Sequence, residues 1–290
     1  MAQGLKKTGS LYYVEKELIH GTHPAQKAKT IARQQAGSAM TPLISFVIAT
    51  HNRPDHLVRA IASVIAQGAE VELIVVADEG SAGTRSAAAH TLREGDTFLS
   101  RPGLRGPSES RNLGRDLAQG QWLCFLDDDD TITPDYLAQV RPHLDRQAVI
   151  YGNRIQVQDK ADLSFGEEVR HSQAGTPPES IEVENFIPVG TFFVPMELAR
   201  QVAFDPHLPT HEDWDYLLGL LARAPLRHVD IWGARYHRPP DPTRNTLTRG
   251  ERSADYLAIY RRHRASSDHV KRQRAQRLTQ MGIALRPRVL

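Results

Sequence analysis

The sequence contains a single cysteine, Cys124, so an internal disulfide is excluded. Cys124 lies in the apolar run 122–126, where a cysteine usually behaves as a small buried hydrophobic residue. No run approaches the ~18 apolar residues that a membrane-spanning helix needs. The first twenty residues also lack the apolar centre of a signal peptide. From these absences we expect a cytoplasmic protein in a reducing compartment.

The chain has almost no net charge, because 36 Lys and Arg residues face 34 Asp and Glu residues. The positive charge gathers instead near the end of the sequence, where residues 261–290 hold nine Lys or Arg and one acid. This run lacks the interleaved aromatic residues that stack on nucleic-acid bases, so we expect no nucleic-acid partner. A solvated helix face is the simplest interpretation. The alternative is that these residues make peripheral contact with the anionic surface on the inner face of the membrane.

Several common site motifs are missing. The first strand-like run is followed by no Gly-rich phosphate loop of the dinucleotide-binding type. The 13 histidines are scattered without the spacing of a structural zinc site. Ser108-Glu109-Ser110 lacks the pattern of a nucleophile elbow. Function must therefore be argued from other clusters.

The pattern from residue 42 onward alternates buried strands with amphipathic helices. This alternation predicts right-handed βαβ units and a mostly parallel sheet covered by helices on both faces. After residue 151 the rhythm breaks, and the remaining segments are less regular. The expected strands are 43–50, 71–77, 97–100, 122–126, 148–151, 154–159, 163–169 and 190–195, and the expected helices begin at 54, 82, 108, 134, 196, 213 and 252.

Polar clusters follow three of the predicted strands. They are Thr50-His51-Asn52-Arg53, Asp78-Glu79 and the four aspartates 127–130. In open α/β sheets, ligands bind beyond the carboxyl ends of the strands. We therefore expect the three clusters to converge on one crevice.

The aspartate run 127–130 is the strongest single signal. Four ionised carboxylates repel one another, and a divalent cation offsets this repulsion. Mn²⁺ or Mg²⁺ typically binds one or two carboxylates together with substrate phosphate oxygens. A solvated acidic loop, or capping of the helix that starts near Pro134, is the alternative. The position after a buried strand, with Arg111 upstream, favours the metal site.

The other clusters each allow a binding role and a purely structural one. A carboxylate at Asp78 can accept a hydrogen bond from a pyrimidine base or a ribose, or it can cap the next helix. The turn at 50–53 can hold an anionic or polar nucleotide group at a helix start, with charge-assisted bonds from Arg53 and Arg111. It can equally be a simple strand-to-helix turn. His237 is a further candidate metal ligand.

Glu212 and Asp213 open a predicted helix. A helix N-terminus stabilises a carboxylate, so dipole pairing alone can explain them. Their functional interpretation is a general base that removes a proton from an acceptor hydroxyl.

Five short sequence blocks, taken in order along the chain, resemble those of the family 2 glycosyltransferases with the GT-A fold. The resemblance covers roughly residues 42–221. Each block alone is weak evidence for the family. Glu79, where the family more often has a second Asp, and His51, where it often has Tyr, depart from the pattern. The blocks are 46–54, 74–81, 110–114, 125–130 and, on the acceptor side, Phe204-Asp205 with 212–215.

The resemblance implies a role for each matching position. Asp127 and Asp129 match the D-x-D metal motif, with Asp130 beside them. Asp213 matches the catalytic base, with Glu212 as its neighbour. The implied nucleotide-sugar-binding residues are Thr50, His51, Asn52, Arg53, Asp78, Arg111, Asp127 and Asp128.

The expected organisation follows from the same match. Residues 1–40 form an N-terminal extension, and 41–235 form an α/β domain with a Rossmann-like sheet and a small acceptor-side subregion. This domain divides into a nucleotide-sugar-binding half, 41–151, and an acceptor-side half, 152–235. Residues 236–290 form a loop and a basic helical extension.

The expected activity is inverting transfer of a sugar from a nucleoside-diphosphate sugar, most commonly a UDP-sugar, with Mn²⁺ or Mg²⁺. The acceptor is a hydroxyl of a glycan, a lipid-linked sugar or another glycoconjugate. A nucleotidyltransferase is one alternative, but it normally carries a Gly-rich basic loop after its first strand. A non-catalytic nucleotide-sugar-binding module is another, and the acidic motif together with Glu212-Asp213 argues against it.

Overall fold

The structure is a computed structural model that describes residues 41–240 and 253–286. The expected N-terminal extension 1–40 lies outside the described residues. So does most of the loop expected after residue 238.

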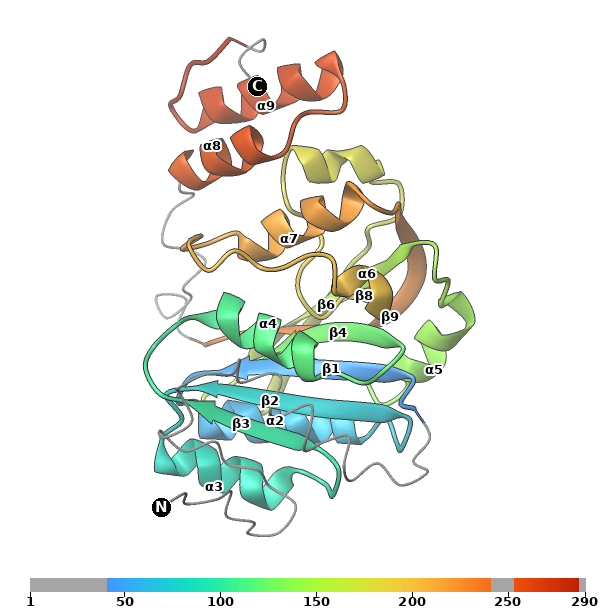
Figure 1. The fold of residues 1–290 in the computed structure, drawn as a ribbon, viewed down its shortest axis with the longest axis vertical. Coiled ribbons are helices and arrows are strands. Elements are labelled where there is room, and N and C mark those ends of the chain that lie inside the picture. Colours follow the sequence, from blue (N-terminus) through green and yellow to red (C-terminus); the bar gives the residue numbers. More distant parts are fainter. Residues whose placement is uncertain (1–40, 241–252, 287–290) are drawn as a thin grey trace, which may run out of the picture.

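The first half of the molecule is a parallel sheet flanked by helices (Figure 1). The strands run in the order β3-β2-β1-β4, and each neighbouring pair is parallel. Helices connect successive strands, as predicted. The elements are β1 (Ile44–Thr50), α2 (Pro54–Ile65), β2 (Val71–Asp78), α3 (Ala82–Thr91), β3 (Thr97–Arg101), α4 (Pro107–Leu117) and β4 (Trp122–Asp127).

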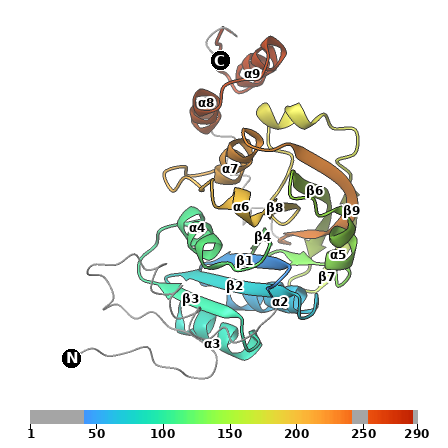
Figure 2. The same ribbon diagram turned by 45° about the vertical axis from the view of Figure 1, so that its right-hand side comes forward.

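Both faces of this sheet are buried, which explains why its strands are continuous apolar runs. Successive side chains point to opposite faces, so Phe46 and Ile48 join one hydrophobic cluster while Val47 joins the other. Helices α2 and α3 cover one face and α4 covers the other (Figures 1 and 2).

Gly114 allows α4 to lie close to the sheet. A Cβ atom at this position would come within 2.3 Å of a methyl carbon of Val47 in β1. The bare backbone of Gly114 therefore sets the distance between α4 and β1. This approach places Arg111, one turn earlier on α4, at the end of the central strands.

The second half of the sheet is mixed. Strand β8 joins β4 antiparallel, β6 follows, and β9 pairs with β6 in parallel. The expected strands 154–159 and 163–169 correspond to the end of β6 and to β7, which pair antiparallel with Gln156 opposite Val169. The strands are β5 (Thr131–Ile132), β6 (Val149–Asp159), β7 (Phe165–His171), β8 (Phe192–Pro195) and β9 (Leu226–Arg238).

One prediction for this half was wrong, and one strand was missed. The segments 148–151 and 154–159 form one strand, β6, because Gly152 and Asn153 continue the chain through a register shift rather than a turn. Strand β9 was not predicted, and it runs through the expected domain boundary at residue 235.

The remaining helices pack around the second half of the sheet and at the C-terminal end. The segment expected to be helical from residue 252 forms two helices, α8 and α9, which are separated by residues 263–267. Helix α8 lies toward α7, and α9 lies on the far side of α8 (Figure 1). These elements are α5 (Tyr136–Val140), η1 (Arg141–His143), η2 (Pro178–Glu182), α6 (Met196–Ala199), α7 (Glu212–Leu221), α8 (Ser253–Arg262) and α9 (Asp268–Gln280).

The basic run at the C-terminal end is only partly a solvated face, which corrects the prediction. Arg274 is fully buried and donates to the backbone carbonyl oxygens of Glu182 and His263. Arg277 pairs with Glu184 at 2.8 Å. Part of this positive charge therefore fastens the two helices to the rest of the molecule.

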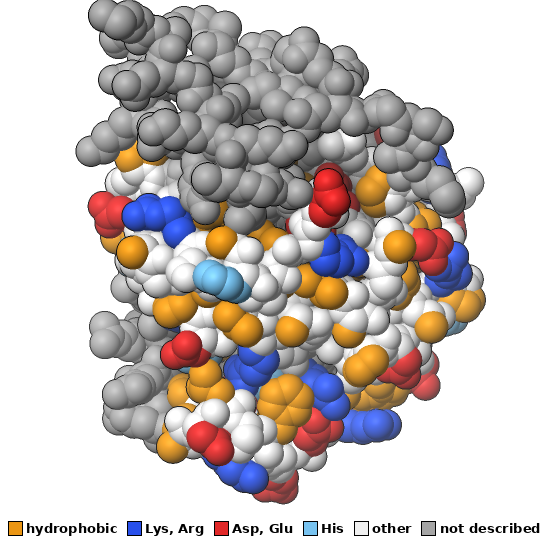
Figure 3. All heavy atoms as spheres, turned by 90° about the horizontal axis from the view of Figure 1, so that it is seen from below, with side chains coloured by type: hydrophobic (Ala, Val, Ile, Leu, Met, Phe, Trp, Pro, Cys, Tyr) orange, Lys and Arg blue, Asp and Glu red, His pale blue; other side chains and the backbone are white. Residues whose placement is uncertain are grey.

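No helix within residues 41–240 or 253–286 is long and apolar enough to cross a membrane. At the end of the molecule where α2 and α3 lie, the described surface carries positive and negative side chains interspersed (Figure 3). The described part of this face therefore shows no concentration of one sign of charge.

Candidate active site

The carboxyl ends of β1, β2 and β4 surround one cavity of about 680 Å³. The predicted convergence of the three polar clusters is confirmed, because each cluster contributes residues to the lining. The end of β9 and the β6–β7 turn close the other side of the cavity. The predicted site residues that line it are Thr50, His51, Arg53, Asp78, Arg111, Asp127, Asp128, Asp129 and His237.

The acidic turn after β4 brings three carboxylates together. Oxygen atoms of Asp127, Asp129 and Asp130 all lie within 4.8 Å of one another. Burial and the charge of neighbouring aspartates raise the pKa of Asp129, and raise that of Asp130 well above its usual range. This all-oxygen set suits a hard divalent cation such as Mg²⁺ or Mn²⁺, which would offset the repulsion.

Asp128 points away from this group. It accepts a hydrogen bond from the Thr50 hydroxyl at 2.7 Å and pairs with Arg53 at 3.2 Å. Burial and the charge of Asp129 raise the pKa of Asp128 to about 6. Asp128 therefore ties the acidic turn to the turn after β1.

The ring of His237 is not aimed at the acidic group. Its Nδ1 lies 2.7 Å from Asp159, and its Nε2 lies 2.8 Å from the Thr131 hydroxyl. Its backbone N–H instead donates to Asp130 at 2.9 Å. His237 therefore supports the acidic turn through its main chain, and ligation of a metal would require one ring contact to break.

The turn after β1 is held by its own polar side chains. Asn52 has a φ of 53° and accepts a hydrogen bond from the Ser81 backbone N–H at 2.7 Å. His51 contacts the backbone oxygen of Asp78 at 2.7 Å. Asn52 joins two strand ends but does not line the cavity, whereas His51 and Arg53 do.

Asp78 is buried and anchors the loop before α4. One of its oxygens pairs with Arg101 at 3.0 Å. The other accepts the backbone N–H groups of Arg105 and Gly106 at 2.8 and 2.7 Å. A carboxylate has about four acceptor positions, so one remains for a ligand. Asp78 therefore holds the loop before α4, which forms part of the cavity wall.

Arg111 joins the two sides of the site. It donates to Asp127 at 2.8 Å and to Glu212 at 2.7 Å. Burial opposes its charge, but the two carboxylates outweigh burial and raise the pKa of Arg111 above its ordinary value. Its guanidinium also lies 5.3 Å from the centre of the Phe204 ring. Arg111 is therefore a fixed cation between the acidic turn and α7.

Glu212 and Asp213 form the first turn of α7. One oxygen of Asp213 accepts from the Asn185 amide at 3.0 Å, and the other accepts from the Trp214 backbone N–H at 2.8 Å. Burial, followed by the charge of Glu212, raises the pKa of Asp213 to about 7. Neither acid lines the cavity, from which Arg111 separates them.

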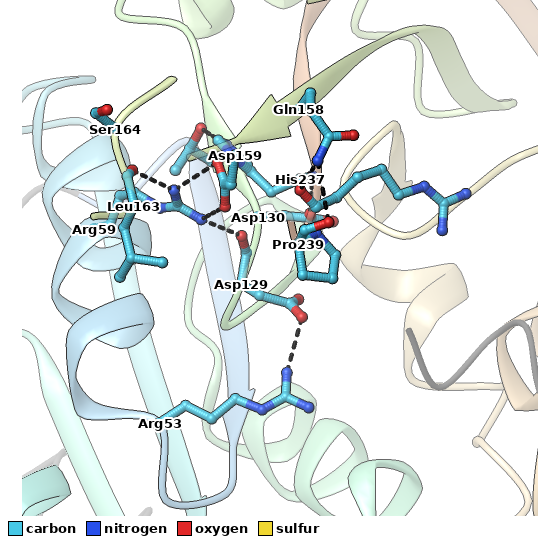
Figure 4. A network of polar contacts seen from close by, with 12 residues as sticks. Arg53, Arg59, Asp129, Asp130, Gln158, Asp159, Leu163, Ser164, His237 and Pro239 are labelled. Carbon is cyan, nitrogen blue, oxygen red and sulfur yellow. Dashed lines mark hydrogen bonds and ion pairs between the residues drawn. The ribbon is translucent and has the colours of Figure 1, made fainter. Parts of the chain in front are cut away.

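A network of polar contacts around Arg59 and Asp159 holds the acidic turn on the side facing α2 (Figure 4). The sequence did not indicate this network. Arg59 on α2 pairs with Asp159 at 2.9 Å and donates to the backbone oxygens of Asp129 and Leu163. Arg101 and Asn185 were missed in the same way. The carboxylate partners of these residues, Asp159 for Arg59, Asp78 for Arg101 and Asp213 for Asn185, lie 100, 23 and 28 positions away, so no local pattern reveals these pairings.

The comparisons with known proteins agree on one family. Residues 45–194, just over half of the 290 residues, match Glycosyl transferase family 2. The chain is 38% identical over 100 residues to the succinoglycan biosynthesis protein ExoO of Rhizobium meliloti, covering 34% of this chain and 29% of that protein. It is 30% identical over 128 residues to the GalNAc(5)-diNAcBac-PP-undecaprenol beta-1,3-glucosyltransferase of Campylobacter jejuni, covering 42% and 41%. Both matches span less than half of the relative's length.

Among solved structures, the fold is similar to S. aureus TarS 1–349 in complex with UDP-GlcNAc. The TM-score is 0.65 at 15% sequence identity, over 83% of this chain and 73% of that chain. At this identity the likeness shows the fold alone. The chain therefore belongs to glycosyl transferase family 2 and has the α/β GT-A fold that its sequence predicted.

Proposed function

We propose that the chain is an inverting glycosyltransferase that moves a sugar from a UDP-sugar to an acceptor hydroxyl. The observation that carries this proposal is the position of Arg111. Its guanidinium contacts the acidic turn at Asp127, and it contacts Glu212, the neighbour of the candidate general base Asp213. The positively charged Arg111 side chain thus lies between the place where a diphosphate would leave and the place where an acceptor would attack.

The donor would occupy the cavity at the strand ends. Arg53 and Arg111 are placed to stabilise negative charge on a departing diphosphate. A divalent cation held by Asp127, Asp129 and Asp130 would supply further positive charge to that leaving group. His51 and the free acceptor position of Asp78 would contact the nucleoside.

Asp213 would act as the base. Its pKa near 7 lets it take a proton from an acceptor hydroxyl and release it again near neutral pH. The acceptor oxygen forms a bond to the anomeric carbon as the bond to the diphosphate breaks. A single displacement of this kind inverts the anomeric configuration.

The nucleotide and acceptor are inferred from related proteins. TarS, whose fold is similar, was solved in complex with UDP-GlcNAc. The Campylobacter relative is named for a glucosyl transfer to an undecaprenol-linked glycan, and the Rhizobium relative for succinoglycan biosynthesis. We therefore propose a role in polysaccharide or lipid-linked glycan synthesis. The exposed Arg264, Arg272 and Arg286 would contact an anionic membrane surface that carries such an acceptor.

Calorimetric titration with UDP, dTDP and GDP, each with and without Mn²⁺, tests the donor site. UDP should bind more tightly when Mn²⁺ is present, and nucleotide sugars should release a nucleoside diphosphate. Release of pyrophosphate from UTP and a sugar 1-phosphate would indicate a nucleotidyltransferase instead. Tight binding without any turnover would indicate a non-catalytic module. Absence of binding by all three nucleotides would overturn the proposal.

A further inference from the structure

The C-terminal helices α8 and α9, here called the α8–α9 pair, pack against the helix that carries the candidate base. Tyr256 and Tyr260 of α8 pack against Trp214 of α7, with ring centres 4.9 and 5.8 Å from the centre of the Trp214 ring. Asp255 accepts a hydrogen bond from the Thr210 hydroxyl, just before α7. The pair therefore contacts the start of α7 through both apolar and polar groups.

Asp215 is the main polar link between α7 and the α8–α9 pair. Its side chain is 5% exposed, although it lies in a helix turn that already carries Glu212 and Asp213. One oxygen of Asp215 lies 2.8 Å from His263 Nε2, and the other pairs with Arg262 at 2.9 Å. The pair thus supplies basic partners to an acidic first turn, where like charges would otherwise repel.

Arg262 also pairs with Asp205, which follows Phe204 in the chain. Phe204 stacks on Tyr216 of α7, with ring centres 4.1 Å apart, and lies beneath the Arg111 guanidinium. One arginine of α8 therefore holds two segments that both lead to Arg111. Its removal would free them together.

A second route reaches Asp213 itself. Ser266, between α8 and α9, donates through its backbone N–H and its hydroxyl to the Glu182 carboxylate, at 2.8 and 2.5 Å. The buried Arg274 donates to the Glu182 backbone oxygen at 2.8 Å. Asn185, three residues later, donates to the Asp213 carboxylate at 3.0 Å. The α8–α9 pair thus reaches the candidate base from two sides.

We infer that Arg262 and His263 are positioning residues for Glu212 and Asp213 and act through Asp215. The inference rests on the proposed function of Asp213. In this view the α8–α9 pair, which lies outside the family match at 45–194, completes the acceptor side of the site. It fixes where the base sits relative to Arg111, while the donor cavity is built without it.

Kinetics of Arg262→Met in the full chain test this inference, with Arg261→Met as the matched control. Arg261 is the neighbouring arginine of α8 and is exposed. UDP release is measured from UDP-glucose and from UDP-GlcNAc with water as acceptor. Because a base displaced by about 1 Å can cost about 100-fold in rate, we expect kcat to fall at least about tenfold in Arg262→Met. KM for the donor and Kd for UDP with Mn²⁺ should change less than about twofold.

Two further measurements separate positioning from a general loss of folding. Arg262→Lys keeps the charge and should recover part of the lost kcat. Amide hydrogen exchange should rise in peptides covering residues 211–216 of Arg262→Met but not of Arg261→Met. A folded Arg262→Met with wild-type kcat, or with donor KM raised in step with the loss of kcat, overturns the inference. A wild-type chain that turns over neither sugar nucleotide, yet binds UDP, rejects the proposed function and the inference with it.

Discussion

Arg111 and Glu212, which are 101 positions apart in the sequence, form an ion pair with a separation of 2.7 Å. The same guanidinium contacts Asp127 at 2.8 Å. This arrangement joins the acidic turn after β4 to the first turn of α7. It connects the proposed donor side of the site to the proposed acceptor side.

Asp213→Asn should abolish most turnover while sparing nucleotide binding. The amide keeps the size of the side chain but cannot take a proton, and a general base usually contributes about 100- to 10,000-fold to the rate. Steady-state turnover and calorimetric binding of UDP with Mn²⁺ check both halves. Asp268→Asn, which changes an exposed acid in the first turn of α9, is the matched control and should behave as wild type.

The pH profile of turnover should rise through about pH 7. The pKa of Asp213 is about 7, so its carboxyl is protonated and inactive at lower pH. The rate should therefore fall about tenfold for each pH unit below that point and level off above it. Asp213→Asn should lose this limb. A wild-type profile that is flat from pH 5 to 8 would contradict the assignment of the base.

Stability should change with pH in the opposite direction. The folded-state pKa of Asp213 lies above the ordinary value of about 3.9, so the protonated carboxyl favours the folded state. This contribution is fully present below pH 4 and is lost as the pH rises through about 7. Denaturant unfolding across this range should show a smaller decline for Asp213→Asn than for wild type. An equal decline in both proteins would argue against a perturbed Asp213.

Asp129→Asn should remove most of the gain in UDP affinity that Mn²⁺ provides. The Asp129 carboxylate belongs to the group that would hold the cation, so its loss should weaken metal binding. The affinity for UDP without metal should change little. Titration with UDP in Mn²⁺ or in EDTA measures the two contributions separately. An Asp129→Asn protein that still responds fully to Mn²⁺ would place the metal elsewhere.

Gly114→Ala should destabilise the fold by about 1–3 kcal/mol, because an added Cβ would meet Val47 at 2.3 Å and force α4 away from β1. Gly83→Ala in α3 is the control, since its Cβ would have no neighbour closer than 3.7 Å. That change should be neutral or stabilising by up to about 1 kcal/mol. Urea unfolding of both variants distinguishes tight packing from a general intolerance of glycine replacement.

The sequence predicted the parallel half of the fold well, because its strands are continuous apolar runs that end in polar clusters. Strand β9 was missed, although Val229 and Ile231 alternate with polar residues in it. The pattern is interrupted by charged and glycine residues. The strand exists because it pairs with β6, and that pairing is not visible in the local sequence.

The sequence indicated many of the residues that line the cavity, but it did not indicate the contacts that those residues make. The convergence on one cavity could be predicted, since carboxyl ends of parallel strands share an edge. The buried attachment of Asp78 to Arg101 and the contact of His237 with Asp159 could not. Such pairings depend on side chains that meet only after folding, so residue type and position indicate a role without fixing its partner.

A crystal structure of the chain with UDP and Mn²⁺ would show directly whether the strand ends hold the nucleotide and its cation. UDP should occupy the cavity lined by His51, Asp78 and Arg111. An anomalous manganese signal should lie between the diphosphate and the carboxylates of Asp127, Asp129 and Asp130. A nucleotide bound elsewhere, or a cavity without manganese at saturating concentrations of both ligands, would contradict the proposed donor site.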